Sequence, residues 1–196
     1  MTAALPDTAT FCGDYAQRLQ AVLANADWSG VARLAEDLLG CWKEGRQVFL
    51  CGNGGSAGNA VHLANDFLYG ISKVKGSGLR VHALSANTAV LTCLANDEGY
   101  DCIYSVQLAV HARAGDLLIV LSGSGNSPNI IEVLEKAREM GVTSYAILGY
   151  SGGKAAKLAD VPIHFAVDDM QIAEDMQLVV GHMTMQWLYQ NRLTKT

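Results

Sequence analysis

The chain has few charged residues, few aromatic residues and no concentration of basic charge. Only 17% of its 196 residues are charged, and 14 Lys and Arg stand against 19 Asp and Glu. A net charge of −5 without a basic segment argues against nucleic acid as a partner. No apolar run approaches the length of a membrane span, and the N-terminus lacks the features of a secretion signal. We therefore expect neither membrane insertion nor export.

Cysteine is scarce and scattered, without the Cys-x-x-Cys spacing of metal or redox motifs. The five are Cys12, Cys41, Cys51, Cys93 and Cys102. They are interpreted as reduced thiols, mostly small apolar core residues, which indicates a cytoplasmic protein. Half of the residues are hydrophobic, enough for one domain with a sizeable core. The low charge further predicts that surface is buried between copies, so we expect an oligomer.

Short, continuously apolar segments alternate with segments of helical spacing. The strands are predicted at 47–51, 80–84, 117–121, 144–148 and 162–166, and the helices at 56–71, 87–96, 101–112, 128–140, 153–159 and 171–190. This alternation predicts an α/β fold, a doubly wound parallel five-stranded sheet in three layers, with ligands at the carboxyl ends of the strands. Two further helices, at about 10–24 and 29–44, form an N-terminal extension over about 10–44.

A polar turn follows the predicted strand 117–121. It contains Ser122, Gly123, Ser124 and Ser127, and Pro128 then opens a helix. Free backbone N–H groups and the positive end of a helix dipole converge at such a turn, and the hydroxyls add donors. The turn holds no lysine. We therefore predict that it binds the phosphate of a small metabolite.

The same arrangement occurs earlier in the chain. The apolar segment 47–51 is followed by Gly52-Asn53-Gly54-Gly55-Ser56 and then by a helical segment. Turns rich in Asn, Ser and Gly are common for purely conformational reasons. Two such turns at the ends of two strands favour a shared ligand site.

These two turns together resemble the SIS (sugar isomerase) family, as do segment 95–100, segment 143–153 and the last helix. Within that family the chain is similar to the phosphoheptose isomerases, which act on sedoheptulose 7-phosphate. The resemblance implies a flavodoxin-like SIS domain over residues 1–196, with terminal helices that form the bundle of a homotetramer. From the residues alone, packing of these helices on their own sheet stays open.

His62 and Asp66 lie four residues apart and therefore on one face of the predicted helix. Such a pair can hold a divalent metal, orient a base, or be an ordinary hydrogen-bonded helix pair. The resemblance implies a metal ligand at His62 and a catalytic acid/base at Asp66, where the family has the longer glutamate.

Glu174 and His182 lie on the last predicted helix. The resemblance implies a polar ligand at Glu174, which is also expected to contact the substrate, and a catalytic, metal-binding histidine at His182. Eight helical residues rise about 12 Å, so the two would not easily meet one ion. Either Glu174 lies on an irregular first turn, or the two come from different protomers. The implied metal site is His62, Asp66, Glu174 and His182, with zinc as the cofactor.

The remaining candidates are polar or glycine residues near strand ends. By resemblance the substrate-binding set is Asn53, Gly54, Gly55, Ser56, Asn59, Asp97, Ser122, Gly123, Ser124, Ser127 and Glu174. One departure concerns Gly70, where the family usually has an arginine that helps to hold the substrate. Lys73 is nearby, but it lacks the bidentate fork of arginine.

Two classes of function are compatible with these residues. The first is an aldose–ketose isomerase that converts sedoheptulose 7-phosphate to D-glycero-D-manno-heptose 7-phosphate through an enediol, with Asp66 and His182 as the acid/base pair. Its product would feed lipopolysaccharide or capsule heptose. The second is a non-catalytic SIS-domain protein that binds a phosphosugar or the bacterial replication initiator. The carboxylate and both histidines favour the isomerase.

Overall fold

The computed structural model describes residues 7–192 and is built around one parallel sheet. The strands are β1 (Gln47–Gly52), β2 (Arg80–Ala83), β3 (Leu117–Ser122), β4 (Thr143–Leu148) and β5 (Val161–His164). Their order in the sheet is β2-β1-β3-β4-β5, and every neighbouring pair is parallel. This confirms the predicted doubly wound α/β sheet, and the strand positions differ from the prediction by at most two residues.

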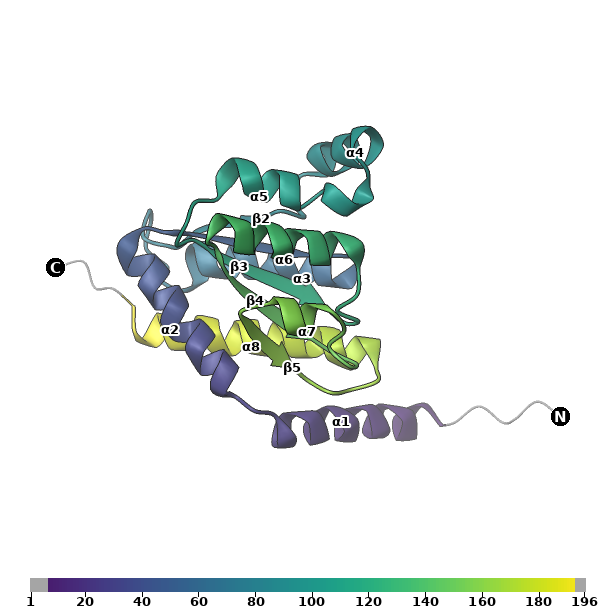
Figure 1. Cartoon of the computed structure of the whole chain (residues 1–196). Helices are drawn as coiled ribbons and strands as arrows, with labels where there is room; N and C mark the ends of the chain where they lie inside the picture. The colour runs from purple at the N-terminus through teal and green to yellow at the C-terminus, as the bar shows by residue number, and fades with distance from the viewer. Residues whose placement is uncertain (1–6, 193–196) are drawn as a thin grey trace.

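Helices cover both faces of the sheet and make three layers (Figure 1). The α-helices are α1 (Thr8–Asn25), α2 (Ser29–Glu44), α3 (Gly55–Asn65), α4 (Thr88–Asp97), α5 (Ser105–His111), α6 (Pro128–Met140), α7 (Ala155–Leu158) and α8 (Met170–Gln190). A π-helical turn, η1 (Asp66–Gly70), continues α3, and a 3₁₀ turn, η2 (Tyr100–Cys102), precedes α5. None of the helices within residues 7–192 is both long and apolar enough to cross a bilayer.

The two faces of the sheet support two separate apolar cores. Along β3 all six residues are buried, and successive side chains alternate between the faces. Leu117, Ile119 and Leu121 pack with α2, α3 and α8, whereas Leu118 and Val120 pack with α5 and α6. Burial on both faces explains why the strands are continuously apolar.

The strand order creates a switch point between β1 and β3. The chain winds from β1 outward to β2 on one side and from β3 to β5 on the other, so the loops after β1 and β3 leave the sheet in opposite directions. A crevice forms at this point in open α/β sheets. Both glycine- and serine-rich turns lie there.

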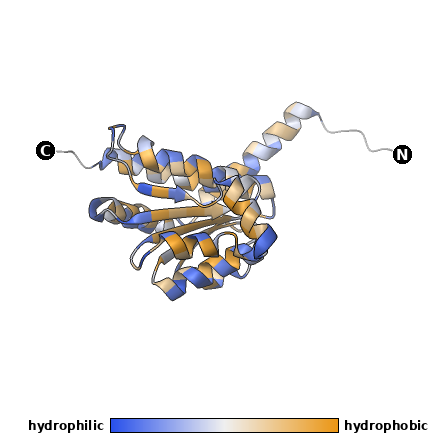
Figure 2. Ribbon diagram, turned by 90° about the horizontal axis from the view of Figure 1, so that it is seen from above, coloured by the Kyte–Doolittle hydropathy of each residue, from blue (hydrophilic) through white to orange (hydrophobic). Residues whose placement is uncertain are grey.

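Helix α1 contributes no buried residue and projects from the rest of the chain (Figures 1 and 2). Its polar contacts are with the start of α8, where Tyr15 donates a hydrogen bond of 2.5 Å to Asp175 and Arg18 pairs with Asp169. Leu19, Val22 and Leu23 are partly buried against the core. Phe11 is 55% exposed. A helix with this much uncovered apolar surface suits packing against another chain.

Two predicted helices were wrong in their extent. The segment 56–71 is α-helical only to Asn65 and then widens into η1. The segment 101–112 is divided into η2 and the shorter α5. Neither break has a proline as a signal, and tertiary contacts explain the first, as described below.

Candidate active site

A cavity of about 280 Å³ lies at the switch point between β1 and β3. It is lined by Asn53, Gly54, Gly55, Ser56, Leu121, Ser122, Gly123, Ser124, Ser127, Met170 and Glu174. Nine of these eleven belong to the predicted substrate-binding set. The structure therefore brings the two turns together from segments about seventy residues apart in the chain.

The turn after β1 depends on glycine at two positions. Gly54 has a φ of 56°, which side-chain-bearing residues rarely adopt. At Gly55 an added Cβ would overlap the carboxylate of Glu174. These glycines let α3 begin directly after the strand and let α8 approach its N-terminus.

The turn after β3 presents hydroxyl and backbone donors. The Ser122 hydroxyl accepts a hydrogen bond of 3.0 Å from the Gly125 amide, which folds the turn back on itself. Pro128 occupies the first turn of α6, and Ser127 precedes it without making a side-chain cap. The Ile130 and Ile131 amides donate to the Ser127 carbonyl, which leaves the Ser127 hydroxyl and the Asn129 amide to face an anion at this helix start.

No lysine or arginine is among the residues that line the cavity, and its one ionisable group is the acidic Glu174. An anion would be held by hydroxyls, backbone N–H groups and the positive ends of α3 and α6. This donor set favours a single phosphate ester over a polyphosphate.

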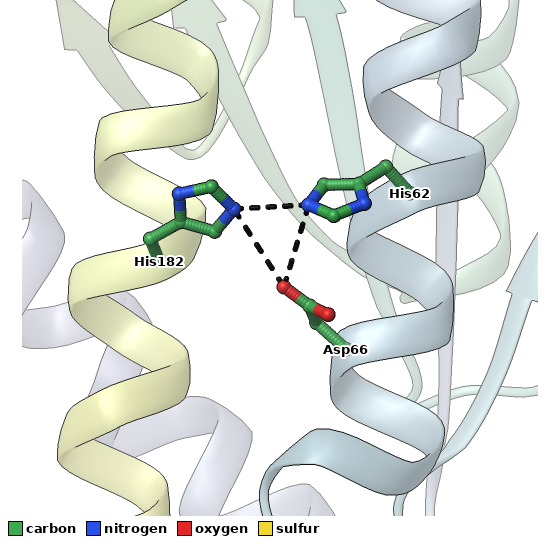
Figure 3. Close-up of side chains that lie close together, drawn as sticks. All are labelled: His62, Asp66 and His182. Carbon is green, nitrogen blue, oxygen red and sulfur yellow. Dashed lines mark hydrogen bonds and ion pairs between the residues drawn. The ribbon is translucent and has the colours of Figure 1, made fainter.

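A second group of polar side chains joins α3 to α8 (Figure 3). His62 Nε2 and His182 Nε2 are 2.9 Å apart, and Asp66 Oδ2 lies 3.6 Å from the first and 3.7 Å from the second. The Asp66 side chain is only 16% exposed, while the two imidazoles are nearly half exposed. At most one proton fits between the two facing nitrogens, so this arrangement can accept or relay a proton.

The backbone at Asp66 changes from α-helix to π-helix. The Ile71 amide donates to the Asp66 carbonyl, five residues back, and the Phe67 carbonyl is left to accept from the Leu79 amide ahead of β2. Phe67 itself is buried in the core. Single π-turns recur at functional sites because they change the direction of nearby side chains.

The three ligand atoms of this group fit a transition-metal ion. A circle through three points separated by 2.9, 3.6 and 3.7 Å has a radius of about 2.0 Å, which matches Zn–N and Zn–O bonds of roughly 2.0–2.2 Å. His62, Asp66 and His182 are thus suitable ligands.

Three predicted site residues lie outside the cavity lining, outside the group of His62, Asp66 and His182, or outside both. Glu174 lines the cavity beside Gly55 and is not grouped with His62, Asp66 and His182. Asn59 donates to the Glu174 carbonyl and the Gln177 side chain, and so ties α3 to α8. Asp97 is exposed at the end of α4, where hydrogen bonds from Asn96 and Cys93 lower its pKa.

The sequence analysis did not identify two buried polar residues that bond to residues of the cavity lining. Asn129, fully buried, bonds to Asn53, and Gln177, 1% exposed, donates to the Ser56 hydroxyl. Both are amides within segments of helical spacing. The feature that could have identified them in the sequence is a polar side chain at a helix position that faces the sheet.

Comparison with known proteins places this geometry in a family. The model of the SIS domain matches residues 10–149. A phosphoheptose isomerase from Akkermansia muciniphila is 40% identical over 157 residues, which cover 80% of this chain and 81% of the relative. The chain belongs to the phosphoheptose isomerase family.

Further members of the phosphoheptose isomerase family agree in sequence and fold. The relative from Rhodospirillum rubrum is 39% identical over 78% of this chain and 81% of its own length. The solved phosphoheptose isomerase from Neisseria gonorrhoeae has a TM-score of 0.83 at 29% identity and covers 92% of this chain and 95% of its own. The solved isomerase from Francisella tularensis shares the fold with a TM-score of 0.87, at 24% identity, over 94% of this chain and 100% of its own.

Proposed function

We propose that this protein is a phosphosugar isomerase that interconverts sedoheptulose 7-phosphate and D-glycero-D-manno-heptose 7-phosphate. The observation that carries the proposal is the pairing of two sites on the same two helices. The anion cavity lies at the start of α3, and the His62–Asp66–His182 group lies farther along α3 and α8. Membership of the phosphoheptose isomerase family supplies the choice of sugar.

The spacing of the two sites suits a long sugar phosphate. His62 follows Ser56 by six residues, which corresponds to a rise of about 9 Å along α3. An extended heptose with its phosphate among the serines would bring its carbonyl end to the histidines.

Asp66 and His182 are the proposed acid/base pair. One group removes a proton from C1 of the ketose and returns it to C2, and the other moves the hydroxyl proton from O1 to O2. The intermediate is a cis-enediol, and the bonds made and broken balance without an external oxidant. The 2.9 Å contact between His62 and His182 would hold the imidazole of His182 in one orientation.

Zinc is the proposed metal, held by His62, Asp66 and His182 and completed by Glu174 or another group. Bound there, it would polarise the carbonyl and stabilise the negative charge of the enediolate. Two imidazoles and a carboxylate suit zinc but also other transition metals.

A homotetramer with sites near protomer contacts is the proposed assembly. Exposed apolar side chains occur on the same helical segments as the half-exposed histidines, among them Val61, Leu68, Tyr69 and Met183. A groove of about 260 Å³ between α2 and α8 is lined by Trp28, Val31 and Trp187. A partner helix in this region would cover both features and could bring a second protomer's Glu174 toward the metal site.

The proposed setting is the cytoplasm, in the supply of heptose for lipopolysaccharide or capsule. The free state of all five cysteines supports a reducing compartment.

The decisive experiment is incubation of the zinc-loaded protein with sedoheptulose 7-phosphate in deuterated water, followed by NMR of the product. An enediol requires one deuterium at C2 of the aldose. A protein that binds the sugar phosphate but neither isomerises it nor exchanges this hydrogen is a binding protein, and the proposal fails.

A further inference from the structure

A pair of hydrogen-bonded amides connects the two turns of the cavity. Asn53 Nδ2 donates to Asn129 Oδ1, and Asn129 Nδ2 donates to Asn53 Oδ1, each at 2.9 Å. Asn53 belongs to the turn after β1, and Asn129 lies in the first turn of α6 after the β3 turn. Two antiparallel hydrogen bonds fix the plane of both amides, which a single bond would leave free to rotate.

Two tyrosines also restrain Asn53 and the residue before it. The Tyr100 hydroxyl donates to Asn53 Oδ1 at 3.1 Å, and the Tyr104 hydroxyl donates to the carbonyl of Gly52, one residue earlier. Burial raises the pKa of Tyr104 to about 12, so this hydroxyl keeps its proton and remains a donor. The oxygen of Asn53 is therefore occupied by protein donors.

One N–H of Asn53 remains for a ligand. The oxygen of this amide accepts from Asn129, Tyr100 and Tyr104, and one hydrogen of its nitrogen is used by Asn129. An amide nitrogen carries two hydrogens. Because Asn53 lines the cavity, the second hydrogen is the group it presents to a bound molecule.

We propose that Asn129 is a positioning residue, which holds Asn53 and the adjoining turn in the arrangement that binds the substrate. Asn129 is fully buried and is not among the residues that line the cavity. It therefore acts through Asn53. The inference rests on the proposed function for the identity of the substrate, whereas the amide pair itself is independent of that function.

A double-mutant cycle between Asn129→Leu and Asn53→Ala tests the proposal. The leucine has a similar volume and cannot hold the amide. We expect each single variant to raise KM for sedoheptulose 7-phosphate about tenfold with a smaller change in kcat, since one oriented hydrogen bond is lost. The double variant should be no worse than Asn53→Ala alone. Effects that multiply would overturn the proposal, because they would show that Asn129 acts independently of Asn53.

Two more variants separate positioning from folding. Val133→Ala removes a fully buried side chain one turn farther along the same helix and leaves both amides of the pair present, so KM should stay unchanged despite lower stability. Tyr100→Phe removes only an exposed hydroxyl, so it should fold and raise KM by a few-fold in the wild-type background, but not beside Asn53→Ala. An increase in KM for Val133→Ala as large as that for Asn129→Leu would overturn the proposal.

Inorganic phosphate, titrated calorimetrically, gives a readout that does not need turnover. Its Kd should rise in Asn129→Leu and stay constant in Val133→Ala. If the wild-type protein binds phosphate and shows this pattern but does not isomerise the sugar, the proposed function fails and the positioning role stands. Unchanged phosphate affinity in Asn129→Leu overturns the positioning role.

Discussion

Replacing Asp66 with asparagine is the sharpest test of proton transfer at the helix pair. The substitution keeps the size of the side chain but removes the negative charge and the ability to take a proton. Asp66 Oδ2 lies 3.6 and 3.7 Å from the two imidazoles and is largely shielded from solvent, so water does not readily replace it. General acid–base groups contribute about 10²–10⁴-fold, or roughly 3–5 kcal/mol of transition-state stabilisation. We expect kcat to fall by that amount.

Phosphate binding should survive the same change. Asp66 follows Ser56 by ten residues, about 15 Å along the helical segment, and lies outside the cavity lining. The rate is measured by NMR of the product, and the Kd of inorganic phosphate by calorimetry, with Glu135→Gln on the exposed side of α6 as the matched control. An Asp66→Asn variant with more than a tenth of the wild-type rate would refute the reasoning. A rate fully restored by excess zinc would instead reassign Asp66 from proton transfer to metal binding.

Three further predictions concern the other parts of the site. Ser124→Ala should raise KM more than it lowers kcat, because a contact to phosphate is made equally in ground and transition states; unchanged kinetics would contradict this. Protein purified without chelator should contain zinc by elemental analysis, and the His62→Ala variant should lose it. A protein without metal that added zinc does not stimulate would contradict the zinc site but not the isomerase activity. Trp187→Asp, in the groove between α2 and α8, should shift the molar mass measured by light scattering from that of a tetramer toward smaller species. A wild-type protein that is a monomer with full activity would exclude the shared-site assembly.

The features that could be predicted from the sequence depend on local, repeating patterns of residues. Apolar segments such as 117–121 are strands buried on both faces, and β3 has six buried residues as that pattern requires. The turns after β1 and β3 could be paired because parallel strands align their carboxyl ends. Eight of the predicted ligand-binding residues, all from these two turns, line one cavity for this reason.

The unpredictable part depends on contacts between distant segments. The helix predicted over 56–71 widens at Asp66 because the Phe67 carbonyl bonds to the Leu79 amide, a partner that no local pattern reveals. The role of Asn129 could not be predicted for the same reason. It depends on the contact with Asn53, which is 76 residues away.

The sequence by itself determined the sheet, its winding and the identity of the polar turns, because backbone geometry and the alternation of apolar segments are local properties. The four-residue spacing of His62 and Asp66 also placed them on one helix face. Only the tertiary structure decided that His182 on α8 meets them and that Glu174 does not, since this depends on how two helices are aligned. Helix α8 lies beside α3, so residues eight apart on α8 contact different levels of α3: Glu174 contacts Gly55 at its start, and His182 contacts His62 farther along.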